Sequence, residues 1–212
     1  MSTKKPKFST TISPVVEAYF AFLTRPSKPY KEDGKPQFKI TGIAEDTPET
    51  REWIEGLLEK AREEAKEAGI KLPKVIASPF NFPEDHDEDA FVPNADGKTS
   101  VDAVYEGKIY FTAKSDYRPG TIDTDREDLP ESVYIMSGDR VRIKMIVKPY
   151  VNGANKGVAL KLKVVQLVEK QAGTGRRANH GEGFDNIEGY KVNKASVAES
   201  DDEEDVAEDK DF

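Results

Sequence analysis

The amino-acid sequence predicts a mainly β domain with one inserted helix, followed by an acidic C-terminal tail. Three observations lead to this fold class. Five segments show the apolar/polar alternation, or the β-branched and aromatic content, that is typical of strands. One further stretch has the three- and four-residue spacing of an amphipathic helix. The last fourteen residues, 199–212, hold almost no apolar side chains and cannot bury enough surface to fold.

The first strand is expected at residues 15–25, where β-branched and aromatic side chains run up to Pro26. Residues 1–13 before it are polar and indicate a flexible arm. We expect the aromatic residues Phe20 and Phe22 of this strand to lie in the core.

The second strand, residues 37–43, alternates more strictly. Phe38 and Ile40 fall on one face, and Lys39 and Thr41 on the other, together with Gln37. One face of this strand is therefore apolar and the other is polar.

A helix follows, because Thr47 can cap it, Pro48 suits the first helical position and Gly69 lies just past its end. Its apolar stripe consists of Trp53, Leu57, Leu58, Ala61, Ala65 and Ala68. Residues 73–96 then mix prolines, phenylalanines and an acidic cluster, which is typical of a long surface excursion.

The third strand is expected at residues 108–115, with Ile109, Phe111 and Ala113 facing the core and Lys108, Tyr110, Thr112 and Lys114 facing out. Residues 116–132 resemble a loop, and residues 133–136 are a candidate short strand.

The clearest alternation covers residues 139–150 and continues, after a turn at Asn152 and Gly153, into residues 157–168. The apolar side chains expected in the core are Val141, Ile143, Met145, Val147, Leu160, Leu162 and Val164. The outward positions are almost all basic, namely Arg140, Arg142, Lys144, Lys148, Lys161 and Lys163, together with Tyr150. Two adjacent strands should therefore share one basic face.

Five short strands and one helix match the components of an OB-fold, a partly open barrel whose outer face binds oligonucleotides. In the usual OB order the helix follows the third strand, whereas here it follows the second, so a strand at residues 75–77 is a candidate addition. We expect an OB-fold domain at residues 1–170, a flexible linker at 171–198 and a disordered acidic tail at 199–212.

The net charge of −8 is confined to the tail. Residues 199–212 hold nine acidic side chains and one lysine, so residues 1–198 are neutral overall. Single-strand binding requires positive charge for the phosphates and aromatic faces for the bases. The expected binding residues are Arg140, Arg142, Lys144, Lys148, Lys108, Lys114, Lys161, Lys163, Tyr110 and Tyr150.

Other classes of protein are disfavoured. The absence of cysteine excludes disulfides, Cys-type zinc sites and thiol nucleophiles, and no apolar run is long enough to cross a membrane. Asp85, Asp87 and Asp89 have calcium-loop spacing, but Ala90 stands where that loop needs glycine. His86 and His180 have no zinc spacing, and Asp123 and Asp125 lack a third carboxylate for a nuclease centre. We expect no enzyme, metal or cofactor.

The sequence resembles the single-stranded DNA-binding proteins of T7-like phages. The resemblance lies in the runs Gly138–Lys144, Val147–Tyr150 and Lys161–Glu169 and in the terminal Asp211–Phe212, with a weaker similarity from Glu17 to Pro26. It implies that Tyr150 stacks on DNA bases. The family has a tryptophan two residues further on, where this chain has Asn152, and the loop residues Phe80 and Phe82 are candidates to replace it.

The resemblance further implies binding of single-stranded DNA without sequence preference, in replication, recombination and repair, in the cytoplasm of an infected bacterium. In the family the tail, here with Asp209, Asp211 and Phe212, contacts the phage DNA polymerase and helicase-primase and shields the DNA groove. A homodimer is left open. The alternative is an acidic-tail interaction protein or chaperone that binds basic partners and not DNA.

Overall fold

The structure, a computed structural model, describes residues 8–29, 34–73, 77–87, 90–92, 101–153 and 155–171. The chain divides into two compact units, Met1–Arg176 and Arg177–Phe212, and every described residue belongs to the first. This unit is mainly β with one α-helix, so the predicted fold class is confirmed.

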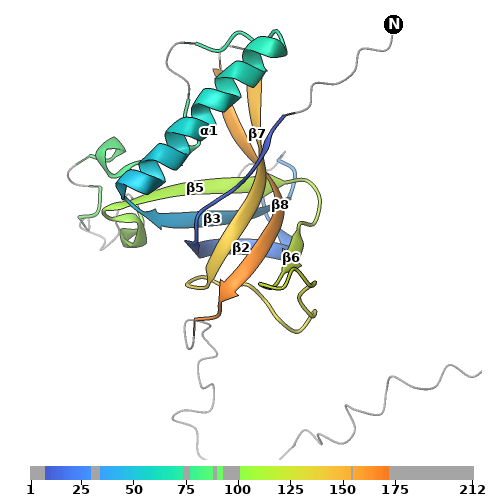
Figure 1. Ribbon diagram of the computed structural model, residues 1–212. Helices are drawn as coiled ribbons and strands as arrows, with labels where there is room; N and C mark the ends of the chain where they lie inside the picture. Colours follow the sequence, from blue (N-terminus) through green and yellow to red (C-terminus); the bar gives the residue numbers. More distant parts are fainter. Residues whose placement is uncertain are drawn as a thin grey trace, which may run out of the picture. The chain divides into compact units, whose positions relative to one another are not determined.

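Five strands of this unit close into a ring (Figure 1). Around the ring, β2 pairs with β3, β3 with β5, β5 with β8, β8 with β7, and β7 again with β2. All of these pairings are antiparallel except that of β5 with β8. The pairing order is that of an OB-fold. The ring strands are β2 (Val16–Ser27), β3 (Gln37–Glu45), β5 (Lys108–Ser115), β7 (Arg140–Asn152) and β8 (Asn155–Glu169).

Three short strands outside the ring were not expected from the sequence: β1 (Thr10–Ile12), β4 (Phe80–Asn81) and β6 (Gly120–Ile122). Strand β1 pairs with the middle of β7, and the backbone N–H of Ile143 donates to the buried Oγ of Ser13 at 2.9 Å. Such strands have two or three residues, too few for any alternation to be visible. Part of the expected flexible arm is therefore ordered against the ring.

The predicted helix is confirmed as α1 (Pro48–Glu67). The N–H of Thr50 donates to the side chain of Thr47 at 3.3 Å, and Gly69 follows with φ of 71°. In Figure 1, α1 lies above β3 and β5. The helix residues buried against the core are Thr50, Ile54, Leu57, Ala61 and Ala65, with Trp53 and Leu58 packed at its margin.

The core fills the interior of the ring, where the predicted inward residues of β5 and β7 are fully or almost fully buried. Phe111 of β5 lies at its centre, with ring centroids 5.2 Å from Phe80 and 5.9 Å from Trp53. The alternation of apolar residues in β5 and β7 therefore predicted correctly which side chains lie in the core.

The expected extra strand at residues 75–77 is not needed, because the ring is complete without it. Ala77 forms only an isolated bridge to Gly157, and residues 75 and 76 lie outside the described residues. The candidate strand at residues 133–136 is also absent. The first strand, by contrast, continues through Pro26 to Ser27.

The prediction that Phe20 and Phe22 belong to the core is wrong. Phe20 is 47% exposed and Phe22 is 39% exposed. Between the pairs Tyr19↔Thr41 and Phe22↔Lys39, β2 has one more residue than β3, and Phe20 has φ of 46°. This bulge shifts the alternation of β2, so the two rings turn outward.

Two further predictions fail for similar reasons of local geometry. Val164 is only partly buried, whereas Val165 is fully buried, because β7 and β8 shift register between Lys144 and Met145. Phe80, proposed as a stacking residue, is 2% exposed and packs in the core instead. Its short strand β4 pairs with β5, so this part of the long loop after α1 packs against the ring.

Two glycines differ in how closely their surroundings are packed. A Cβ at Gly42 would lie 2.8 Å from Cζ of Phe111 and 3.1 Å from Cδ1 of Ile143, whereas a Cβ at Gly56 would meet nothing within 4 Å. We therefore expect Gly42→Ala to lower the free energy of unfolding by about 1–3 kcal/mol through overpacking. Gly56→Ala should raise it by up to about 1 kcal/mol, because alanine favours the helix.

Urea denaturation of the two variants beside the parent chain measures both effects. Equal effects of the same sign would contradict the packing described around Phe111.

Candidate nucleic-acid interface

A row of three lysines crosses the outer face of the ring. Lys39 of β3 pairs with Lys114 of β5, and Lys114 pairs with Lys161 of β8. Neighbouring strands lie about 4.8 Å apart, so the row spans roughly 10 Å. We call these three residues the lysine row.

The strands themselves place the lysine row on the outer face. The neighbouring residues Ile40, Ala113 and Leu162 are buried, and side chains alternate across a strand, so the lysines point away from the core. Within the described part of the chain, no carboxylate forms an ion pair with any of the three. The row therefore presents uncompensated positive charge.

A depression beside the lysine row contains the predicted stacking residue. Tyr150 lines it together with Lys114, Lys161, Gln37, Thr112 and Asn81. Tyr150 is opposite Gly157 in the β7–β8 pair, and its hydroxyl would lie 3.1 Å from a Cβ at Gly157. The carbonyl oxygen of Ala77 would lie 2.9 Å from the same Cβ. Glycine at this position thus allows both groups to approach the strand.

A second depression lies on the other side of Lys161. It is lined by Lys148, Lys161 and Lys163 with the aromatic residues Phe8 and Tyr117. Tyr117 is 82% exposed. The carboxylate of Asp116 also lines it, but accepts a hydrogen bond from the Gln37 side chain at 2.7 Å. The two depressions meet at Lys161, which makes one continuous basic and aromatic surface.

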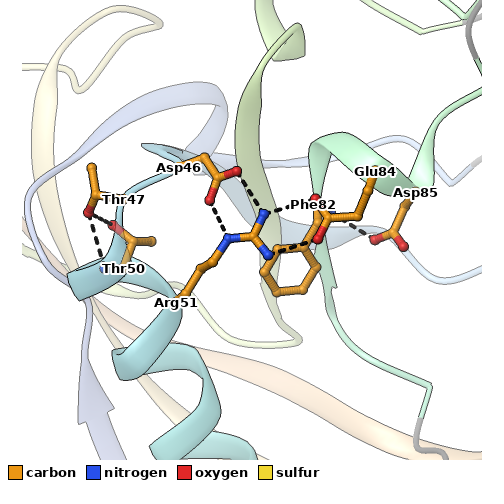
Figure 2. Close-up of polar contacts among 7 residues, drawn as sticks. All are labelled: Asp46, Thr47, Thr50, Arg51, Phe82, Glu84 and Asp85. Carbon is orange, nitrogen blue, oxygen red and sulfur yellow. Dashed lines mark hydrogen bonds and ion pairs between the residues drawn. The ribbon is translucent and has the colours of Figure 1, made fainter.

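One wall of the first depression is the segment that begins at Ala77 and passes through β4. Arg51 of α1 holds the residues that follow β4 in place through contacts with Phe82 and Glu84, which we call the Arg51 clamp (Figure 2). The Arg51 guanidinium contacts Asp46 Oδ1 at 2.6 Å and Glu84 Oε1 at 2.8 Å. It also lies over the ring of Phe82, 5.2 Å from its centroid. The hydrogen bonds from Arg51 lower the pKa of Glu84, so this clamp is charged at neutral pH.

The other basic residues predicted on β7 lie on the same outer side but further along the strand. Arg140, Arg142 and Lys144 are exposed. At about 3.3 Å per residue, Arg140 is roughly 33 Å of strand away from Tyr150. Arg140 also pairs with Glu169 at 3.5 Å. These residues extend the basic surface but do not join the depression around Tyr150.

Lys108 and Tyr110 lie at the opposite end of β5 from Lys114. Lys108 pairs with Glu45 at 3.4 Å. The ring of Tyr110 stacks on that of Tyr105 at 4.1 Å and on that of His86 at 5.7 Å. Burial raises the pKa of Tyr110, so its hydroxyl stays neutral.

The same end of the outer face is acidic. Tyr19 donates a hydrogen bond to Asp102 at 2.7 Å, which raises the pKa of Tyr19. Asp85 adds a negative charge near Tyr110. The outer face therefore changes from basic at the lysine row to acidic around Tyr110.

Sequence reasoning did not select three residues of this surface, Lys39, Tyr117 and Gly157. Lys39 had a visible signal, since it falls on the polar face of its strand. Tyr117 stands in a loop without periodicity, and the role of Gly157 depends on the approach of Ala77, 80 residues away in sequence. Their places follow from the pairing of distant strands.

Some residues named from the sequence lie outside the described residues, and Asp123 and Asp125 lie in a turn. The tail residues Asp209, Asp211 and Phe212, and also His180 and Asp89, lie outside the described residues. Asp123 accepts hydrogen bonds from the N–H groups of Asp125 and Glu127 and thereby closes a turn.

In the described ranges no three metal-binding side chains are grouped. No helix in those ranges combines the length and the apolar composition of a membrane span.

The lysine row crosses the ring strands β3, β5 and β8, and β7 carries Tyr150 beside it. This defines an OB-type domain with an outer surface suited to oligonucleotides. Residues 11–202 match the family model described as Enterobacter phage Enc34, ssDNA-binding protein. The chain belongs to this family of phage single-stranded DNA-binding proteins, which confirms the resemblance found in the sequence.

Solved structures show the same fold at low sequence identity. The single-stranded DNA-binding protein from bacteriophage Enc34 in complex with ssDNA is 19% identical with a TM-score of 0.55, over 76% of this chain and 87% of that chain. Its C-terminal truncation is 18% identical with a TM-score of 0.53, over 76% and 86%.

The single-stranded DNA-binding protein gp2.5 of bacteriophage T7 is 18% identical with a TM-score of 0.52, over 88% of this chain and all of that chain. No curated protein gives a significant match.

Proposed function

We propose that this protein binds single-stranded DNA without sequence preference, across the outer face of β3, β5 and β8. The observation that carries the proposal is the lysine row, three aligned cations without carboxylate partners among the described residues. Membership of the phage single-stranded DNA-binding family supports it.

The chemistry of the surface matches a flexible polyanion with exposed bases. Lysines attract phosphates as point charges and read no base sequence. Tyr150 and Tyr117 offer aromatic faces beside the lysines, and stacking tolerates every base. Stacking on these rings needs base faces that are exposed, as they are in a single strand.

The family resemblance supports a finer role for the protein, which we propose as follows. The protein covers single strands during phage DNA replication, recombination and repair, in the cytoplasm of the infected bacterium. Asp209, Asp211 and Phe212 recruit the phage DNA polymerase and helicase-primase. The nine acidic residues of 199–212 compete with DNA phosphates for the lysine row.

Substitutions at Tyr150 and Lys161 test the proposed surface by fluorescence titration with oligo-dT. Tyr150→Ala should weaken binding by about 1–3 kcal/mol through lost stacking, whereas Tyr150→Phe should keep it. Lys161→Ala should reduce the slope of log affinity against log salt by roughly 0.7, the value for one phosphate contact on a single strand. Lys108→Ala is the matched control, since Glu45 already neutralises Lys108. Equal effects of Lys108→Ala and Lys161→Ala on the salt dependence would contradict a DNA-binding surface at the lysine row.

Removal of residues 199–212 tests the competing tail. The truncated chain should bind oligo-dT more tightly than the full chain at low salt, because an internal polyanion is gone, and the difference should shrink as salt screens it. A control chain keeps the length of the tail but replaces its acidic residues with the neutral amides. If neither the full nor the truncated chain binds single strands at about 50 mM salt, the proposal fails and the chaperone alternative gains.

A further inference from the structure

Two phenylalanines on β2 are exposed although they belong to a ring strand. Phe20 and Phe22 are 47% and 39% exposed, while Leu23 beside them is buried. Exposed aromatic rings on a strand lose the burial that would stabilise the fold, so their position needs a reason outside the core.

The backbone of β2 is distorted where these rings emerge. Phe20 has φ of 46°, in the left-handed region that disfavours residues with a Cβ atom. The distortion is a bulge, with one extra residue on β2 between Tyr19 and Phe22. Bulges often turn a side chain toward a functional site. Here the bulge places Phe20 and Phe22 on the surface, with a strained backbone at Phe20.

Phe22 continues the lysine row onto the next strand. It pairs directly with Lys39 across β2 and β3, and the Lys39 ammonium lies 5.2 Å from the centre of its ring. The order across four neighbouring strands is therefore Phe22, Lys39, Lys114, Lys161. An aromatic ring stands at one end of a line of cations, and Tyr150 lies near the other.

The phenylalanines form one side of a shallow depression. Its other side is the loop before β7, which contributes the exposed residues Tyr134 and Met136. The lining has no acidic side chain. The depression is thus apolar, open and adjacent to a cation, which suits a flat base whose phosphate contacts Lys39.

We propose that the β2 bulge is a second base-binding platform, on which a nucleobase of single-stranded DNA stacks against Phe22 and Phe20. The DNA then runs from Tyr150, along the lysine row, to β2. Because the cation and the ring are in register, a nucleic acid fits this surface better than an apolar protein segment, which would leave Lys39 unpaired. The inference rests on the proposed function and extends the DNA path by one strand.

The test compares variants that keep or remove the π face. Phe22→Leu keeps an apolar side chain without a ring, and Phe22→Trp keeps the ring. Phe20→Gly removes a ring and also relieves the backbone strain, because glycine adopts positive φ readily. If the melting temperature of this variant does not fall, weaker DNA binding cannot be attributed to lost stability. Affinity for oligo-dT of about 12 nucleotides is measured at low salt for each variant beside the parent chain.

We expect Phe22→Leu and Phe20→Gly to bind roughly 5- to 150-fold more weakly, the range for one lost stacking contact, and Phe22→Trp to bind like the parent. Binding of oligo-dT should also quench the new tryptophan. Unchanged affinity of Phe22→Leu, with a parent chain that binds, would overturn this inference alone. A parent chain that does not bind oligo-dT would overturn the proposed function itself.

Discussion

The alternation of β7 and β8 is the constraint on which the rest of this structure depends. The two strands pair along their whole length, and each also pairs with two further strands: β7 with β1 and β2, and β8 with β5 and β6. Their inward side chains form much of the core, so a slip of one residue would place charged residues such as Lys144 inside the ring. The same register fixes which residues face outward, and Lys161 is thereby aligned with Lys114 and Lys39.

The ends of this hairpin are fixed by different means. At the turn, Gly153 adopts φ of 59° and Gly157 leaves space for Tyr150 and Ala77. At the other end, the buried carboxylate of Asp139 accepts from Lys170 Nζ at 2.7 Å and from the N–H of Met136 at 2.8 Å. A buried carboxylate is stable only when charge and hydrogen bonds compensate it. Asp139 therefore holds the exit of β8 against the start of β7.

The sequence predicted those parts of the fold in which apolar residues recur at the regular spacing of a helix or a strand. It located the helix, its cap at Thr47 and the inward residues of β5 and β7, because each follows from spacing within one segment. It placed Phe20 and Phe22 in the core because a bulge has no periodic signal, and it placed Phe80 in the site because only the pairing of β4 with β5 buries that ring. For the site, the alternation within single strands selected Lys114, Lys161 and Tyr150. The alignment of Lys39, Lys114 and Lys161 arises from the pairing of three strands distant in sequence.

We propose that a single strand of DNA lies across the lysine row. Reductive methylation of lysines, followed by mass spectrometry of the full chain with and without oligo-dT at low salt, tests it most directly. We expect DNA to protect Lys39, Lys114 and Lys161 from methylation, whereas Lys60 and Lys66 on α1 should remain as reactive as in the free protein. Protection centred on the helix, or equal reactivity of all lysines with DNA bound, would contradict it.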